Sequence, residues 1–168
     1  LPFLTHPDWT VRRRSGFLTP RVTLSSDKGL TTIIPYYKVI DQTSDATFNA
    51  NIYQRLGYSL RTDYRKLWDK ANLHASVITA NVETYKERRE FVGAVDATYS
   101  SQIGNGWEVS AQLQRASQDT FMRRYNFNQD TSLKSNITAS RIINNRYYHV
   151  KVSDRQSLLA SNKAFDET

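Results

Sequence analysis

The sequence predicts an all-β protein in which the strands follow one another as an antiparallel up-and-down meander. Apolar and polar residues alternate with a period of two along most of the chain, as in strands with one apolar and one polar face. Polar turns interrupt the alternation at regular intervals, and little helical periodicity competes with it. Nine strands are expected, at residues 16–26, 30–40, 45–54, 58–66, 72–82, 90–101, 107–116, 131–142 and 146–156.

The first two expected strands form a hairpin that turns at residues 27–29, and each contains a proline, Pro20 and Pro35. Proline lacks the backbone donor that a strand gives to its neighbour, so within a sheet it belongs at an edge or a bulge. The two prolines therefore predict a place where adjacent strands are held weakly. The alternative is a pair of bulges near a strand end, or simple protection of an edge.

The next strands separate their two faces more cleanly. The strand at 45–54 places Phe48 and Ile52 on one face and Asn49 on the other. Between 58 and 66, apolar residues alternate with charged ones, namely Tyr58, Leu60 and Tyr64 against Arg61, Asp63 and Arg65. The strand NLHASVITANV at 72–82 is the least regular. The later segments WEVSAQLQRA and RYYHVKVSDRQ repeat the clean alternation.

The lengths of strands and connections favour a membrane-spanning barrel. Connections at 41–44, 68–71, 102–106 and 144–145 are short, whereas those at 83–89 and 117–130 are longer and charged. Outer-membrane barrels have short periplasmic turns and long external loops, a rule that the tight connections at 27–29 and 55–57 obey only in part. The expected strands also exceed the usual soluble length of about five or six residues and suit a tilted crossing of a bilayer.

Composition agrees with this class without selecting it. No apolar run is long enough for a membrane-spanning helix, but the strands of a membrane barrel are only half apolar. The net charge of +7 favours acidic partners such as nucleic acid, phosphorylated lipid head groups or an anionic surface. The absence of cysteine excludes disulfides and thiolate metal sites from this stretch.

Three alternative classes share parts of the pattern. A soluble antiparallel sandwich or half-open barrel would show the same alternation against a protein core. A soluble basic β-domain that binds nucleic acid would explain the charge and the tyrosines, but it requires basic and aromatic residues on one face. Arg61 and Arg65 lie on the face opposite Tyr58 and Tyr64, which argues against nucleic acid. Another transport barrel, such as a porin, is the third alternative.

No motif predicts an enzyme. His6, His74 and His149 are scattered without the spacing of metal ligands, and no nucleophile-elbow, zinc-protease or P-loop pattern occurs. We therefore expect no catalytic residue, no metal and no cofactor.

Residues 12–60 resemble the start of the barrel in the LptD family, the lipopolysaccharide-assembly proteins of the outer membrane. The segments that carry the resemblance are RRRSGFLTP, PYYKVI and SDATFNANIYQRLGYSL, in the order of the family. DTFMRRYNF at 119–127 is similar to an external loop of the family, and QSLLASN is similar to a segment that leads into a later strand. The segment LPFLTHPDWTV at 1–11 looks like the exit from a periplasmic β-jellyroll, and its sequence resembles that of a divergent branch, such as an α-proteobacterial one.

The resemblance implies a fold, a function and partners. Residues 1–14 would be the exit from the jellyroll and 15–168 the truncated first part of a very large barrel of about 26 strands. The function implied is transport of lipopolysaccharide into the outer leaflet of the outer membrane of a Gram-negative bacterium. The partners implied are lipopolysaccharide, an LptE-type lipoprotein plug, periplasmic β-jellyroll bridge proteins and outer-membrane lipid, with no nucleic acid. In the family the lipid leaves between the first and last strands, while the sugar passes through the lumen.

The resemblance also suggests site residues. Pro20 and Pro35 match the family's prolines at the lateral gate, where weak pairing would let the wall part. Candidates for the path through the lumen are Arg61, Asp63, Arg65 and Lys151, whose basic members can bind phosphate. Arg12, Arg13 and Arg14 precede the first strand and are candidates for contact with lipid phosphates or head groups at the periplasmic interface. The alternatives are lumen residues that only solvate one another and a basic anchor that never contacts substrate.

Overall fold

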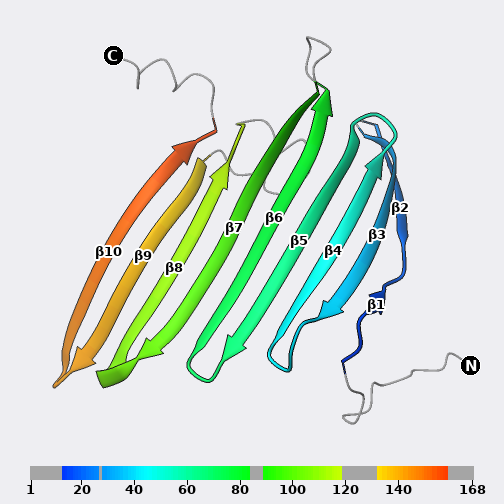
Figure 1. Cartoon of the computed structure of the whole chain (residues 1–168). Coiled ribbons are helices and arrows are strands. Elements are labelled where there is room, and N and C mark those ends of the chain that lie inside the picture. The colour runs from blue at the N-terminus through cyan, green and yellow to red at the C-terminus, as the bar shows by residue number, and fades with distance from the viewer. Residues whose placement is uncertain (1–12, 27, 84–88, 119–131, 159–168) are drawn as a thin grey trace, which may run out of the picture.

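The structure is a single antiparallel sheet (Figure 1). This computed structural model describes residues 13–26, 28–83, 89–118 and 132–158. The strands are β1 (Gly16–Phe17), β2 (Arg21–Ser25), β3 (Gly29–Val39), β4 (Ser44–Tyr53), β5 (Gly57–Trp68), β6 (Ala71–Glu83), β7 (Arg89–Ile103), β8 (Trp107–Ala116), β9 (Ser132–Ile143) and β10 (Arg146–Ser157). Both β1 and β2 pair with β3, and every later strand pairs with its sequence neighbour. The predicted meander is confirmed.

The first expected strand differs from its prediction. Residues 16–26 form two strands, β1 and β2, which are separated at 18–20. The other predicted strands all occur, with ends that shift by a few residues; β7, for example, begins at Arg89 and ends at Ile103. No helix within the described ranges has the length and apolar character needed to cross a membrane.

The short connections have the backbone geometry of tight turns. Asn144 and Asn145, between β9 and β10, have φ values of 46° and 61°. Two successive residues with positive φ are typical of the type I′ hairpin turn, whose twist matches that of the strands it joins. A 3₁₀ turn, η1 (Gly104–Gly106), joins β7 to β8. These turns keep successive strands adjacent, which maintains the meander.

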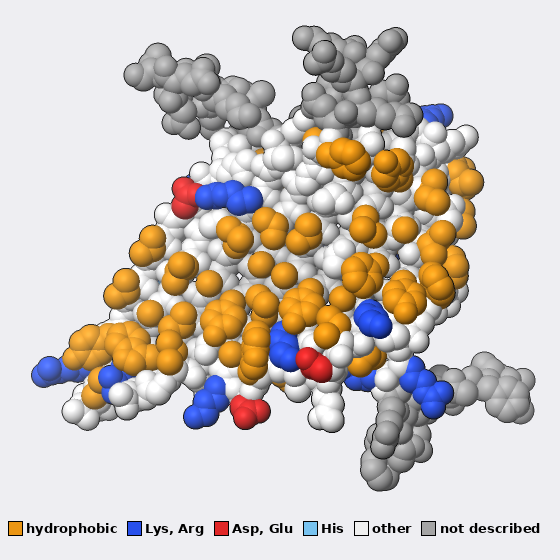
Figure 2. Space-filling view, viewed as in Figure 1, with side chains coloured by type: hydrophobic (Ala, Val, Ile, Leu, Met, Phe, Trp, Pro, Cys, Tyr) orange, Lys and Arg blue, Asp and Glu red, His pale blue; other side chains and the backbone are white. Residues whose placement is uncertain are grey.

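The two faces of the sheet differ in character. We call the face that bears Asn51, Ser59 and Ile78 the inner face, because most of the buried side chains lie on it, and the opposite face the outer face. Figure 2 shows apolar side chains spread across one face of the sheet. The large apolar residues that are exposed on the outer face include Phe48, Ile52, Tyr58, Leu60, Val77, Phe91, Leu113, Ile137, Val150 and Val152.

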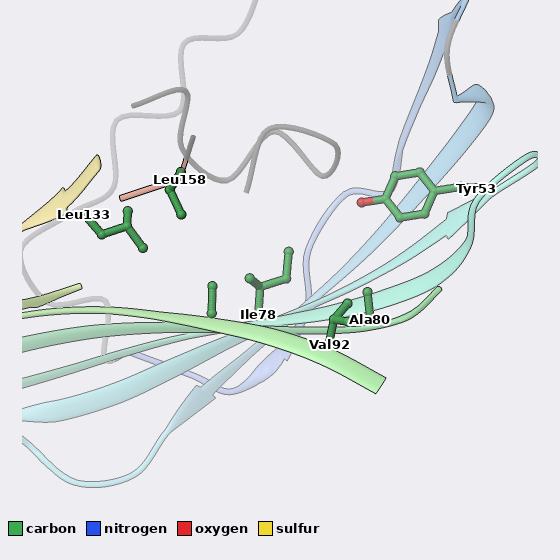
Figure 3. Close-up of a cluster of buried hydrophobic side chains, with 7 residues drawn as sticks. Tyr53, Ile78, Ala80, Val92, Leu133 and Leu158 are labelled. Atoms are coloured by element: carbon green, nitrogen blue, oxygen red, sulfur yellow. The ribbon is translucent and has the colours of Figure 1, made fainter. Parts of the chain in front are cut away.

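Part of the inner face is apolar as well. Figure 3 shows a cluster of buried apolar side chains on the same side of the sheet, namely Tyr53, Ile78, Ala80, Val92, Leu133 and Leu158. Ala94 belongs to the same cluster. Ile78 and Ala80 lie on the inner face in the second half of β6. This part of the strand therefore carries apolar residues on both of its faces. This explains why NLHASVITANV shows the least regular alternation in the sequence.

Side chains replace part of the backbone ladder between β8 and β9. Backbone pairing between the two strands covers only 107–112 and 136–141. Beyond it, Gln114 Oε1 accepts from Lys134 N at 3.2 Å, and Ser135 Oγ accepts from Gln114 N at 3.1 Å. Gln156 reaches across from β10, where its Oε1 accepts from Ala116 N and its Nε2 donates to Ala116 O. These polar side chains satisfy backbone groups where the two strands diverge.

We expect Gly29→Ala to destabilise the barrel by about 1–2 kcal/mol, the cost of a left-handed backbone for a residue with a Cβ. Gly29 has a φ of +70°, and an added Cβ would lie 2.8 Å from Gln54 Oε1, which accepts from Leu30 N. The measurement is the free energy of unfolding in urea of the full-length protein in phospholipid vesicles.

Gly104→Ala is the matched control for this change. Gly104 has no positive φ, and nothing lies within 4 Å of the position that its Cβ would take. It should leave the free energy of unfolding unchanged. Equal losses in the two variants would show that the turn at Gly29 does not require glycine.

Candidate functional site at the first strands

A β-bulge interrupts the first strand at Pro20. Gly16 and Phe17 pair with Tyr37 and Tyr36 of β3, and Leu18 N donates to Pro35 O at 2.9 Å. Beyond the break, Arg21 pairs with Ile33. The residues at positions 19 and 20 therefore share a single place opposite β3, which is the definition of a bulge. A bulge can accommodate proline, because its extra residue takes no part in the ladder.

Pro35 weakens the same interface from the other side. It lies inside β3, in register with Asn49 of β4. In an antiparallel ladder the carbonyl and the N–H of one residue point toward the same neighbour. Because Pro35 O accepts from Leu18 N, its missing donor would have faced Leu18 rather than β4. Both prolines therefore remove pairing between the first strand and β3, while pairing of β3 with β4 continues without a break.

We call this interface, between residues 16–25 and β3, the first-strand seam. A backbone hydrogen bond contributes about 1 kcal/mol net in water, whereas an unpaired backbone group in hydrocarbon costs several. On the seam, the register of β1 with β3 covers Gly16 and Phe17 and that of β2 covers 21–25, with a break between them, whereas β3 pairs with β4 without a break from Thr31 to Val39. The seam is therefore weaker than the pairing that follows it in the sheet.

An ionic cluster around Asp45, which we call the Asp45 cluster, fixes the end of the seam that lies next to the turn between β3 and β4. Arg13 donates to Asp45 Oδ2, to Tyr37 Oη at 3.1 Å and to the carbonyl of Gln42 at 3.2 Å. Arg65 Nε donates to the other carboxylate oxygen at 2.9 Å. The Asp45 side chain is only 8 % exposed. The segment that enters the first strand is thus fixed to β3, β4 and β5 just below the weak part of the seam.

The inner face beside the seam forms a polar hollow. Arg61 Nε donates to both oxygens of Asp63, at 3.0 and 3.1 Å. Ser76 Oγ and Asn49 Nδ2 donate to the same carboxylate, at 2.5 and 3.3 Å. The hollow runs from β2 to β6, and its polar lining comprises Arg21, Thr23, Ser25, Lys28, Thr31, Asn49, Asn51, Tyr53, Arg61 and Asp63.

The structure separates the residues that the sequence grouped. Arg61 and Asp63 lie together in the hollow, whereas Arg65 belongs to the Asp45 cluster. Lys151 is exposed on β10, at the opposite end of the sheet. Arg13 is part of the Asp45 cluster, Arg14 is exposed, and Arg12 lies outside the described residues.

Arg21 and Lys28 were not singled out from the sequence. The signal was present, since Arg21, Thr23 and Ser25 alternate with Val22 and Leu24 after the proline. This alternation places the Arg21 side chain on the face of the sheet that lines the hollow.

A family model described as LptD protein matches residues 1–167. The chain is 29 % identical over 125 residues to the LPS-assembly protein LptD of Pseudoalteromonas translucida (strain TAC 125), covering 73 % of the chain and 16 % of that protein. It is 29 % identical over 153 residues to the protein of the same name from Polaromonas sp. (strain JS666 / ATCC BAA-500), covering 85 % and 18 %. With that of Haemophilus ducreyi (strain 35000HP / ATCC 700724) it shares 41 % over 56 residues, 33 % of the chain and 7 % of the relative. The chain thus spans less than a fifth of the length of these relatives.

We expect Asp45→Asn to lower the free energy of unfolding by about 1–2 kcal/mol, because two guanidinium groups lose the charged partner of their hydrogen bonds. The measurement is urea unfolding of the full-length protein in vesicles, together with the rate of protease cleavage just before residue 16, which should rise.

Asp41→Asn is the control. Asp41 lies in the turn between β3 and β4, where Lys66 Nζ donates to it at 2.7 Å and holds the pKa of its carboxyl well below its usual range. The Asp41 side chain is 47 % exposed, and an exposed pair contributes little. Stability and cleavage should therefore stay close to those of the unmodified protein. Equal responses at Asp41 and Asp45 would remove the special role given to the Asp45 cluster.

Proposed function

The chain belongs to the LptD family, and on that premise we propose that it forms the start of an outer-membrane β-barrel that inserts lipopolysaccharide into the outer leaflet. The observation that carries the proposal is the first-strand seam. There, a bulge at Pro20 and the missing donor of Pro35 weaken the pairing between the first strand and β3 at neighbouring positions. In a closed barrel the first strand is also the strand that must meet the last one. A first strand that is held only weakly by β3 can shift, and the wall can then open sideways at its junction with the last strand.

The outer face supports placement in a membrane. On β8 the outward-facing residues are apolar from Trp107 to Leu113 and are followed by Arg115, roughly 27 Å from Trp107 at about 3.4 Å per residue. A tilted strand of that length crosses about 20 Å, close to the apolar band of about 25 Å in outer-membrane barrels. Trp68 and Trp107 lie at one end of their strands, where aromatic girdles are placed. We infer that this end, with its short turns, faces the periplasm of a Gram-negative cell.

The polar hollow is suited to the sugar portion of the same substrate. Arg21, Lys28 and Arg61 offer cationic donors, and Asn49 and Asn51 offer amides, all on the inner face next to the seam. Guanidinium and ammonium groups bind phosphate through charge-assisted hydrogen bonds, and amides bind sugar hydroxyls. The lipid would then leave beside the first strand, where it meets the last one, while the phosphorylated sugar stays in the hydrated interior. Arg61, Asp63 and Arg21 are the residues we assign to this path; Arg65 and Lys151 lie outside the hollow.

The partners proposed are those expected of the family. They are a lipoprotein plug of the LptE type inside the barrel and β-jellyroll bridge proteins that deliver lipopolysaccharide at the periplasmic end. The Asp45 cluster fixes the entering chain at that end, where a jellyroll would join the barrel. No bond is made or broken in this function, and no group of metal-ligating side chains occurs among the described residues. A nucleic-acid site is disfavoured because Arg61 and Arg65 lie on the face of β5 opposite Tyr58 and Tyr64.

We expect a photocrosslinking amino acid at Leu18 of the full-length protein to form lipopolysaccharide adducts in living cells. Leu18 lies at the seam opposite Pro35 and is 48 % exposed. Adducts are scored on blots of the purified protein, and they should disappear when the supply of lipopolysaccharide from the inner membrane is stopped.

Leu113 is the matched control, because it is 46 % exposed and lies on the outer face of β8, five strands away from the seam. Label at Leu113 reports only lipid that already surrounds the barrel, so it should be weaker and should persist after the supply stops. Equal and equally persistent labelling at both positions would favour a transport barrel of another type, with prolines that are only structural.

A further inference from the structure

An arginine on the outer face lies between two aromatic side chains without an acidic partner. Arg141 of β9 is in register with Trp107 of β8 on one side and Tyr148 of β10 on the other. Its guanidinium carbon is 5.8 Å from the centre of the Trp107 ring. Its Nε is buried and has no hydrogen-bond partner in the part of the chain that the structure describes. The site therefore offers positive charge and lacks an anion.

A groove, which we call the outer groove, lies on the same face of the sheet. It is farther from the short turns than the row formed by Trp107, Arg141 and Tyr148. Its apolar lining includes Leu73, Ala97, Tyr99, Ala111, Leu113 and Ile137. The register explains its shape, since Ala97 lies opposite Leu113, and Ala111 lies between Tyr99 and Ile137. The alanines form a floor, and the larger side chains form the walls. A flexible hydrocarbon chain fits such a surface better than a polar ligand does.

One amphiphilic molecule can contact both features. Arg141 and Ile137 are four residues apart on β9, roughly 13 Å at about 3.4 Å per residue. We propose that the row of Trp107, Arg141 and Tyr148, together with the outer groove, binds one phospholipid of the periplasmic leaflet. Its phosphate lies at Arg141, and one acyl chain occupies the groove. This inference depends on the proposed placement of the sheet in a membrane.

The charges at the two ends of the groove favour this orientation. At the far end Arg115 is paired with Asp154, which itself lines the groove. That arginine already has its anion, whereas Arg141 has none among the described residues. Arg141 also lies at the end that carries the short turns, where we place the periplasmic head groups. A phosphate is therefore drawn to Arg141, and the acyl chain points toward the middle of the bilayer.

The test uses the full-length protein folded in vesicles of phosphatidylethanolamine and phosphatidylglycerol, with a small share of phosphatidylethanolamine that carries a diazirine in its acyl chain. After illumination, the labelled peptides are mapped by mass spectrometry. Adducts should concentrate on β8 and β9. Arg141→Gln should reduce them about fivefold, the effect of one basic residue near a head group. Ala111→Leu, which fills the floor of the groove, should reduce them while Arg141 is intact.

Arg115→Gln combined with Asp154→Asn is the matched control, because it removes an arginine from the same face of a neighbouring strand without leaving an unpaired carboxylate in the groove, and it should leave the yield unchanged. Folding of each variant is verified by its heat-modifiable mobility on gels. Adducts spread evenly over the outer faces of β3 to β10, or equal yields from the two arginine variants, would overturn the phospholipid site while leaving the membrane placement intact. A properly folded protein without adducts on any outer-face peptide would overturn the membrane placement as well.

Discussion

The rest of the structure depends on one constraint, which is that a backbone group inside a bilayer has no water to bond with. Every strand of a membrane sheet must therefore satisfy its ladder from its neighbours. From β3 to β8 the chain meets this demand with nearly unbroken pairing. Where β8 and β9 diverge, the amides of Gln114 and Gln156 satisfy the exposed backbone groups. The bulge at Pro20 and the missing donor of Pro35 at the first-strand seam stand out against this background.

The seam combines a fixed end with a weak middle. Arg13 and Arg65 hold Asp45 at the end where the chain enters the sheet, and Val39 N donates to Ser15 Oγ beside them. Above this point β1 ends after two residues, and the ladder resumes only at Arg21. A strand held in this way can move away from β3 in its middle without losing its position at the base. For the proposed function, this arrangement would provide an opening that closes again after each lipid.

Much of the fold could be predicted from the sequence, because period-two alternation is a local property. The strands with one apolar and one polar face, such as β4 and β5, were placed within a few residues of their observed ends. The break in the first strand also had a local signal, which is Pro20 itself, because a proline within a strand marks an edge or a bulge. The contacts that define the site had no such signal. Arg13 and Asp45 are 32 residues apart, and only the register of β3 and β4 brings them together. The direction of the missing Pro35 donor likewise depends on which neighbour its carbonyl faces.

The central claim is that the first strand is joined to β3 more weakly than the other strands are joined to one another. Amide hydrogen exchange of the full-length protein in lipid nanodiscs tests it most directly, with Pro35→Ala as the comparison, since alanine restores a donor opposite Leu18. We expect the amides of residues 16–25 to exchange much faster than those of 45–66, and Pro35→Ala to slow exchange in the first strand alone. Equal protection of the two segments, or a first strand that does not respond to Pro35→Ala, would contradict it.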